Sequence, residues 1–554
     1  MFNHIFNSQT KTVTFAAFLL AVSGLISRLL GLFRDRLLAG RFGAGQELDI
    51  YFAAFRIPDF VYGVVIVGGI TAAFLPVFSE YFEKSPKIAV ELTNNVLNCF
   101  LILLILVCGF LAIFTPFIID FIAPGFSAQS KVLTVTLTRI MFLSPIFFGL
   151  SSIFSGILQY FNRFLTYAIA PILYNLGIIF GILFLVPIFG VFGLAYGVIL
   201  GSFLHLLVQI PAAKISGFKY RAVFNFHYPG LKKIFKLMIP RTIATAATNL
   251  NLIIITAIAS TLTVGSITIF NFSNNLQYVP VGLIGIPFAI SSFPVLSRNW
   301  ANGKKEKFFK NLSSTIGQTL YFIIPISFLI FLLRAQIVRL ILGTGQFGWW
   351  ETRLTAASLG LFCFGIFANS LVPLVSRAFF AVHDTKTPAL IGVASIGANI
   401  ILSLLFTFWL KSGNIFQVFF ANVLSLGDVG DIEIIGLPLA LSLTVLIQLF
   451  LLLIFLYQKI GDFNLKSILV SLAKILLATL LMLIFSYLVR QIIANFVNMQ
   501  TFLGIFIQTF VSGLVGILVY FFVTLLLKSP EIKDLKLAIL KQFAKTTYDE
   551  SEIT

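Results

Sequence analysis

Charged residues are scarce in this chain. Of its 554 residues 10% are charged, against roughly 25% in an average soluble domain. Hydrophobic residues make up 59%, and the mean hydropathy is +1.02. This composition excludes an ordinary soluble globular protein. Long apolar runs recur from residue 13 to residue 527, and one crossing of a bilayer takes ~20 apolar residues. The sequence therefore predicts a polytopic membrane protein.

Alternating apolar and polar residues are also missing from the long segments. The stretch from Leu101 to Ile119 is continuously apolar, whereas the strands of a transmembrane β-barrel are about ten residues long and alternate in polarity. A barrel is thereby excluded, and we expect an all-α fold.

Cysteine and histidine are few and have no metal-ligand spacing. Cys99, Cys108 and Cys363 all fall in apolar segments without a CxxC pair, so we expect small buried side chains and neither a disulfide framework nor a metal site. The stretch Gly343–Gly348 matches GxGxxG, but no predicted strand precedes it. We interpret it as a glycine-rich turn in an outside loop and predict no cofactor.

Cations outnumber acids in this chain. There are 38 Lys and Arg against 20 Asp and Glu, a net charge of +18. In a soluble protein this excess would indicate a nucleic-acid partner. Here the cations concentrate in alternate loops and at the two termini, which is typical of cytoplasmic loops. We predict that both termini are cytoplasmic and that the bilayer, not nucleic acid, is the partner. Arg28 and Arg34 interrupt the first apolar segment, so we expect a retained helix and not a signal peptide.

Fourteen spans are predicted from the apolar stretches. Their centres lie near residues 25, 65, 105, 148, 177, 202, 250, 282, 322, 366, 398, 446, 479 and 514. Span two ends Phe74-Leu75-Pro76-Val77 and span eight ends Phe293-Pro294-Val295-Leu296, with the two prolines 218 residues apart. Six helices per half make this a parallel repeat. The predicted organisation is a lobe over 1–217, a second lobe over 218–460, two additional spans over 461–527 and a cytoplasmic tail over 528–554.

Ionisable groups inside apolar segments are the candidate functional residues, because a central Arg or Lys costs roughly 2.5 to 3.5 kcal/mol on insertion scales. We predict a cationic, water-filled cavity that binds a phosphate-bearing substrate, with an Arg28–Asp35 ion pair as the structural alternative for those two residues. Glycines and prolines within the spans are candidate hinges. The substrate-binding candidates are Ser27, Arg28, Arg34, Arg56, Arg139, Arg241 and Asn275, the charge-coupling candidates are Asp35, Asp49 and Asp59, and the hinge candidates are Gly31, Pro58, Gly282, Gly285 and Pro287.

Several short motifs recur in order along the chain. They are Ser27-Arg28-Leu29-Leu30-Gly31-Leu32-Phe33-Arg34-Asp35, Phe42-Gly43-Ala44-Gly45 with Asp49, Ala54-Phe55-Arg56-Ile57-Pro58, Ala73-Phe74-Leu75-Pro76, Ala123-Pro124-Gly125-Phe126, Asn162-Arg163-Phe164, Arg377-Ala378-Phe379-Phe380-Ala381 and Asp384-Thr385-Lys386-Thr387-Pro388. Together they resemble the MurJ/MviN family of lipid II flippases over about residues 14 to 527. The resemblance includes the fourteen-span count, whereas related exporters of the superfamily usually have twelve.

The chain departs from that family at three places. The usual Pro-Asn with a following Arg reads Pro58-Asp59 with Tyr62, the usual Glu-Gly reads Val67-Gly68, and a frequent cavity Arg is replaced by Asn274-Asn275. Arg28, Arg34 and Arg56 match, so the resemblance implies a site for a lipid-linked pyrophosphate. It also implies a bacterial inner-membrane transporter that works by alternating access, with cell-wall synthesis proteins as candidate partners.

Three alternatives stay open at this stage. One is an exporter of another polyprenyl-pyrophosphate-linked glycan or amphiphile. Another is a membrane enzyme, for which the only loop acids of the right kind are Asp428, Asp431 and Glu433. The third is a non-transporting scaffold. For energy coupling we predict the membrane potential, with any coupling cation secondary. Asp384 is interpreted as the N-cap of the helix of span eleven.

Overall fold

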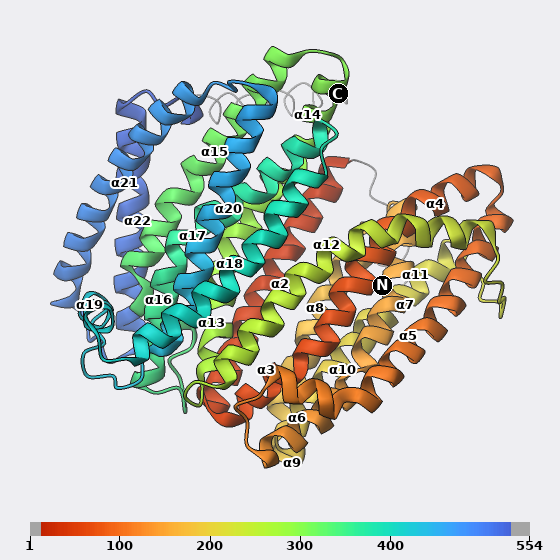
Figure 1. Ribbon diagram of the computed structural model, residues 1–554, viewed down its shortest axis with the longest axis horizontal. Helices are drawn as coiled ribbons and strands as arrows, with labels where there is room; N and C mark the ends of the chain where they lie inside the picture. The colour runs from red at the N-terminus through yellow and green to blue at the C-terminus, as the bar shows by residue number, and fades with distance from the viewer. Residues whose placement is uncertain (1–12, 533–554) are drawn as a thin grey trace, which may run out of the picture. The chain divides into compact units, whose positions relative to one another are not determined.

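The computed structural model describes residues 13–532, with side chains undescribed at 13–17, 71–72, 240–241, 243–244 and 247–248. Within this range the chain is helical and forms no strand (Figure 1). The helices are α2 (Val13–Phe42), α3 (Gln46–Val61), η1 (Tyr62–Ile70), α4 (Thr71–Lys84), α5 (Pro86–Ile122), α6 (Ala128–Met141), α7 (Leu143–Tyr160), α8 (Phe164–Phe180), η2 (Gly181–Leu185), α9 (Val186–Phe189), α10 (Phe192–Leu207), α11 (Gln209–Ile215), α12 (Pro229–Ser260), α13 (Ser266–Pro280), η3 (Val281–Gly285), α14 (Ile286–Ala301), α15 (Lys305–Leu332), α16 (Arg334–Ile341), α17 (Trp349–Ala381), α18 (Lys386–Lys411), α19 (Ile415–Val423), η4 (Glu433–Ile435), α20 (Gly436–Ile460), α21 (Leu465–Ala494) and α22 (Phe502–Leu526).

The all-α membrane fold predicted from composition is confirmed. Twelve helical segments of the described chain are long and apolar enough to cross a membrane, and twelve of the fourteen predicted centres fall in them. The other two centres fall in α2 and α12, which are 30 and 32 residues long. Such lengths exceed the ~20 residues that one crossing takes, so the count of fourteen is consistent with the structure.

Two compact units make up the described chain. Unit 1 contains the described residues up to Asn271 together with Ile341–Glu351, and unit 2 contains Phe272–Leu340 and the described residues from Thr352 onward. The helix of span seven, α12, packs on α3, α4, α5 and η1 inside unit 1. The lobe boundaries at 217, 460 and 527 were inferred from the repeat and stay a prediction.

Small residues allow a close helix contact between α8 and α10 in unit 1. Gly197 and Gly201 of α10 lie against the backbone of α8 and η2, and a Cβ on Gly201 would stand 2.4 Å from the Tyr174 carbonyl oxygen. A Cβ on Gly177 would in turn stand 2.3 Å from the Cα of Gly201. Glycines spaced four residues apart let two backbones approach each other in this way, so this ridge is a packing feature.

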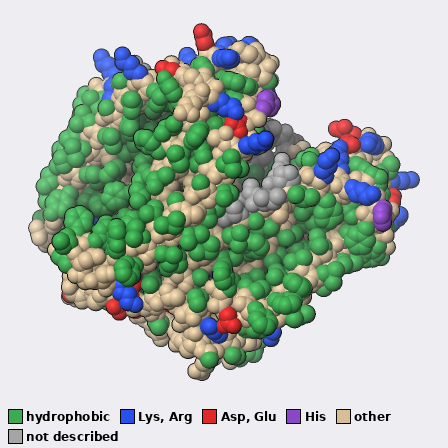
Figure 2. All heavy atoms as spheres, in the orientation of Figure 1, with side chains coloured by type: hydrophobic (Ala, Val, Ile, Leu, Met, Phe, Trp, Pro, Cys, Tyr) green, Lys and Arg blue, Asp and Glu red, His purple; other side chains and the backbone are tan. Residues whose placement is uncertain are grey.

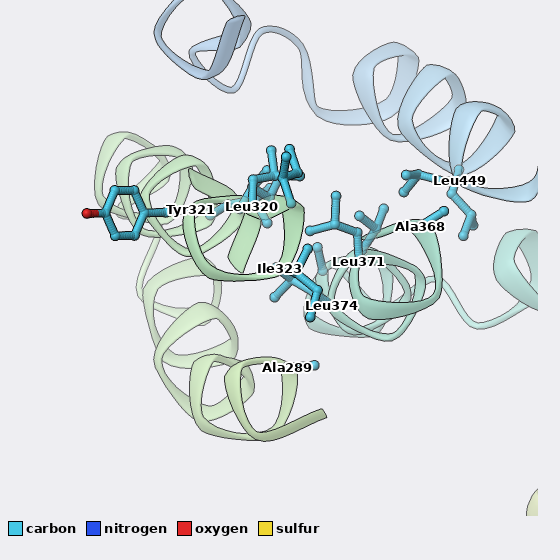
Figure 3. Packing of buried hydrophobic residues seen from close by; sticks show 14 of the residues in the cluster. Ala289, Leu320, Tyr321, Ile323, Ala368, Leu371, Leu374 and Leu449 are labelled. Carbon is cyan, nitrogen blue, oxygen red and sulfur yellow. The ribbon is translucent and has the colours of Figure 1, made fainter. Parts of the chain in front are cut away.

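The core of unit 2 is built from α15, α17 and α20. Ile323, Leu371 and Leu374 point toward one another between α15 and α17, and Leu449 approaches from α20 (Figure 3). Tyr321 points to the opposite side of α15, where its hydroxyl lies 2.9 Å from Thr524 Oγ1 of α22. α22 packs along α21, so the two additional spans belong to this unit.

A π-helical segment interrupts span two and span eight at corresponding places. η1 follows α3 in unit 1, and η3 lies between α13 and α14. Pro76 and Pro294 then follow in α4 and α14, as the 218-residue repeat predicts. Two of the hinge candidates, Gly282 and Gly285, lie within η3. Such segments occur mostly at functional places in helices, and the hinge assignment stays a prediction.

The surface agrees with a membrane location. Hydrophobic side chains cover most of the visible flank of each unit, whereas most Lys, Arg, Asp and Glu gather near the helix ends (Figure 2). On α5 the exposed side chains include Leu106, Phe110, Ile113 and Phe117. An apolar band of this kind faces lipid in a helical membrane protein.

Candidate functional site: a polar cluster in unit 1

Arg34 and Asp35 of α2 form an ion pair. Arg34 Nη2 and Nε donate to Asp35 Oδ1 at 2.8 and 3.0 Å, and the two side chains are 22% and 4% exposed. Arg34 Nη1 also donates to Asn175 Oδ1 of α8 at 3.4 Å. The charge of Arg34 is therefore balanced by its neighbour, and its guanidinium group is tied to α8.

Asn175 connects the Arg34 guanidinium group to Ser27, another of the predicted substrate-binding residues. Its Nδ2 donates to Ser27 Oγ at 3.2 Å and to the Ser27 carbonyl at 3.3 Å. Ser27, Gly31 and Arg34 lie on one face of α2 because they are four and three residues apart. A Cβ at Gly31 would lie 3.8 Å from Asn175 Oδ1. Arg28, which is partly buried, follows Ser27 in the same turn.

Arg56 of α3 reaches two other helices. Its Nε donates to Thr256 Oγ1 of α12, and its Nη2 donates to Asn271 Oδ1 of α13, both at 2.7 Å. A guanidinium group has five N–H donors, and those on Nη1 have no hydrogen-bond partner among the described residues. Asp59 follows one turn later and lies within reach of the charges of Arg56 and Arg34.

Asp49 is satisfied by the start of α13. Its Oδ2 accepts from the Gly265 N–H at 2.7 Å, and its Oδ1 accepts from the N–H and the hydroxyl of Thr268 at 2.8 and 2.7 Å. A carboxylate at a helix N-terminus binds otherwise unpaired N–H groups and interacts favourably with the helix dipole. Its geometry is that of a helix cap.

The other predicted substrate-binding residues are Arg139, Arg241 and Asn275. Arg139 is exposed on α6 and donates to the Ala112 carbonyl at 2.9 Å. The Arg241 side chain lies outside the described residues. Asn275 belongs to unit 2.

Sequence reasoning missed the partners of these arginines. Asn175, Thr256, Asn271, Tyr51 and Tyr174 each lie in an apolar segment, where an isolated polar residue was the available signal. The two tyrosines lie near Arg34. Guanidinium, amide and hydroxyl donors suit an anion with several acceptor oxygens. Among residues 13–532 no group of three or more His, Cys, Asp or Glu is placed to hold a metal ion.

The Gly343–Gly348 stretch is a packing turn. The Gln346 N–H donates to the Gly40 carbonyl at 3.0 Å. Gly345 has φ +56 and lies so close to Gly40 that a Cβ there would stand 2.1 Å from the Gly40 oxygen. Glycine is required by both the positive φ and this approach. The interpretation as a glycine-rich turn is confirmed.

Comparison with known proteins decides the family. The profile described as lipid II flippase MurJ matches residues 38–507. The chain belongs to the MurJ family. A probable lipid II flippase MurJ of Buchnera aphidicola subsp. Acyrthosiphon pisum is 30% identical over 512 residues, covering 90% of this chain and 94% of its relative. The lipid II flippase MurJ of Burkholderia cenocepacia is 29% identical over 68% of this chain and 75% of its own length.

Solved structures agree with this membership. A lipid II flippase MurJ in an inward closed conformation matches with a TM-score of 0.73 and 27% identity, covering 92% of this chain and 98% of the other. An inward-facing MATE-family multidrug resistance transporter of the MOP superfamily matches with a TM-score of 0.62 at 14% identity, which shows a shared fold alone. The predicted MurJ/MviN resemblance and the multi-pass membrane fold are thus confirmed.

Proposed function

We propose that this chain is a flippase that moves lipid II, the lipid-linked peptidoglycan precursor, from the cytoplasmic to the outer leaflet of the cytoplasmic membrane. The observation that carries the proposal is the Arg56 guanidinium group, which is fixed by Thr256 and Asn271 and keeps donors available. A pyrophosphate offers the acceptor oxygens that such a fork binds bidentately. Membership in the family supplies the substrate.

Transport by alternating access involves no bond made or broken, so we propose a transporter and not an enzyme. The sugar-pyrophosphate head enters the polar cluster of unit 1, while the lipid tail stays in the bilayer. Bending at η1 and η3 supplies the motion, because a π-helical segment already departs from the regular ladder of hydrogen bonds. Cell-wall synthesis proteins are our candidate partners.

For energy coupling we propose the membrane potential. One elementary charge crossing 100 mV changes the free energy by ~2.3 kcal/mol, which is enough to bias a positive cluster. Asp35 pairs with Arg34 and Asp49 caps α13, so Asp59 is our remaining candidate for a carrier of a coupling cation. Transport in proteoliposomes at clamped potentials tests this. An unchanged rate at zero potential, together with loss of transport in Asp59→Asn, would contradict it.

The proposed topology has both termini in the cytoplasm. It is tested by single-cysteine labelling in a variant that lacks Cys99, Cys108 and Cys363. We expect an impermeant reagent to label Asp428→Cys, at a side chain that is 70% exposed, in intact cells and to leave Lys305→Cys unlabelled. The reverse pattern would overturn the orientation.

The function is tested by expressing the chain in a bacterium depleted of its own flippase, with lipid II accessibility at the outer surface as readout. We expect the wild-type chain to restore accessibility. If the chain accumulates in the membrane and does not restore lipid II accessibility, the result supports the second candidate function, an exporter of another polyprenyl-pyrophosphate-linked glycan. The departures at Tyr62, Val67 and Asn275 favour that candidate. Binding of purified protein to lipid II separates the two.

A further inference from the structure

Two arginines of unit 2 come together where α15 ends. Arg334 Nη1 donates to the Phe331 carbonyl at 3.0 Å, and Arg490 Nη1 of α21 donates to the Leu332 carbonyl at 3.1 Å. Two guanidinium groups from different helices therefore bind consecutive carbonyl groups. Each also lies over an aromatic ring three residues earlier in the chain, Arg334 over Phe331 and Arg490 over Tyr487.

This pair has no acidic partner in the described part of the chain. None of the ion pairs between described residues includes either arginine. Burial lowers the pKa of Arg334, Cys363 acts in the opposite direction, and the nearby charge of Arg490 lowers the pKa further. Two like charges held together and partly out of water are unfavourable without a counter-ion.

Amide side chains fix the surroundings of the pair. Gln508 of α22 is 3% exposed and donates from Nε2 to the Arg490 carbonyl at 2.9 Å. Its Oε1 accepts from Gln336 Nε2 of α16 at 3.3 Å. The Gln336 Oε1 is buried without a hydrogen-bond partner among the described residues. α16, α21 and α22 are thus joined around the two guanidinium groups, each of which has N–H donors left over.

The position along α21 sets the depth of the pair in the membrane. Exposed apolar side chains on this helix run from Leu469 to Ile492, so Arg490 lies in the last turn of that run. The rise from Leu469 to Arg490 is roughly 31 Å at 1.5 Å per residue, which matches the ~30 Å of a hydrocarbon layer. Arg490 therefore lies at a polar boundary, at the opposite end of α21 from Lys466. Under the proposed topology this is the outer boundary, where arginines are less common than inside.

We propose that Arg334 and Arg490 bind the phosphate group of a lipid in the outer leaflet. Guanidinium groups with free donors at headgroup depth, and without an acidic partner, recognise that chemistry bidentately. The phosphate belongs either to an anionic phospholipid or to the pyrophosphate of the translocated lipid. The assignment to the outer leaflet rests on the proposed function and topology, whereas the phosphate site itself does not. The competing explanation is that the two arginines only anchor their helices at the interface.

The test uses the full-length protein in phosphatidylcholine nanodiscs, with bound lipid counted by native mass spectrometry. One arm titrates phosphatidylglycerol and the other titrates lipid II. The variant is Arg334→Gln with Arg490→Gln, and the matched control is Arg353→Gln, which removes one cation of unit 2 that already has a partner, Asp428. We expect the double variant to bind at least one of the two lipids about tenfold more weakly, and the control to bind as the wild type does.

The arm that weakens identifies the source of the phosphate. If the double variant binds each of the two lipids as tightly as the wild type does, the proposed site is wrong and interfacial anchoring explains the two arginines. If the double variant does not fold, the single variants Arg334→Gln and Arg490→Gln carry the same comparison. Failure of the flippase-depletion experiment, with phosphatidylglycerol binding still dependent on the two arginines, would refute the proposed function and leave this site standing.

Discussion

The two units share a backbone plan and differ in the chemistry of their interiors. Both carry a π-helical interruption followed by a proline at repeat-related positions. In unit 1 the spans contain Arg34, Asp35, Asp49 and Arg56. Arg34 pairs with Asp35 on the same helix, and Arg34, Asp49 and Arg56 are each hydrogen-bonded to a neighbouring helix. In unit 2 the ion pairs lie at helix ends, as in Lys459–Asp384 and Arg353–Asp428.

The difference indicates a division of labour. Keeping ionisable groups in an apolar span is costly, and unit 1 bears this cost at several positions. At the positions equivalent to Arg56 and Asp59, unit 2 carries amide side chains. At the 218-residue offset Arg56 corresponds to Asn274, whose Oδ1 accepts from Gln277. We infer that unit 1 carries the recognition of charge within the spans, whereas the arginine pair of unit 2 lies at the membrane boundary, and that unit 2 contributes the matching half of the motion.

The largest expected effect breaks this asymmetry directly. Arg56→Ala should reduce flipping about a hundredfold or more, since two charge-assisted bonds to a phosphate are worth roughly 1.5 to 3 kcal/mol each. Asn274→Ala, at the repeat-equivalent position, should reduce it only slightly. Lipid II accessibility in the depleted bacterium measures both variants, with membrane accumulation as the control. Equal losses in the two variants would show that the recognition of charge within the spans is not confined to unit 1.

The second comparison concerns stability. Arg34→Ala leaves the buried Asp35 carboxylate without its ion-pair partner, and breaking a buried pair costs about 3 to 5 kcal/mol. Arg353→Ala leaves Asp428, whose side chain is 70% exposed, so little change is expected. Thermal unfolding of the purified variants measures both. Arg34→Ala combined with Asp35→Ala should recover much of the loss, and an Arg34→Ala variant as stable as the wild type would contradict the pairing.

The third prediction separates a cap from a charge carrier. Asp49→Ala removes the acceptor for two N–H groups and one hydroxyl at the start of α13, so the free energy of unfolding should fall by about 2 kcal/mol. Asp49→Asn keeps one carbonyl acceptor and should lose less. Transport per folded molecule should stay near the wild-type value in both. A stable Asp49→Asn variant that no longer responds to an ion gradient would instead assign the coupling to Asp49.

The spans and the repeat could be predicted because both are properties of local sequence. Twenty consecutive apolar residues indicate a crossing wherever they occur, and Pro76 and Pro294 reveal the repeat by spacing alone. Asp384 was predicted as the N-cap of α18. The N-cap residue is Thr385, one position later, but the capping contact comes from Asp384, whose Oδ1 accepts from the Lys386 and Thr387 N–H groups. This contact could be predicted because the carboxylate and the N–H groups that it binds are neighbours in the sequence.

The partners of Arg56 and Asp49 could not be predicted in this way. Thr256, Asn271 and Thr268 lie about 200 residues further along the chain, and only the packing of α3 against α12 and α13 brings them near. The π-helical segments were missed for a related reason. Their apolar sequences fit an ordinary helix equally well, and the tertiary packing around glycines decides between the two geometries.

The smallest expected effect concerns the Asp384 cap of unit 2 and its dependence on pH. Burial alone raises the pKa of Asp384, but the hydrogen bonds from Lys459 and Thr387 outweigh it and lower the pKa to about 2. In the unfolded chain an Asp has a pKa of about 3.9. A carboxylate whose pKa is lower in the folded state contributes stability above the unfolded value, and this contribution is lost as the pH falls toward about 2. Since Lys459 is partly exposed, the contribution at neutral pH should be about 1 to 2 kcal/mol. Thermal unfolding of the wild type and of Asp384→Asn should therefore differ by a constant amount between pH 7 and about pH 5, and the difference should shrink below about pH 4. Lys459→Gln should reduce it at every pH. A difference that stays constant down to pH 3 would show that the cap acts through its geometry alone and not through its charge.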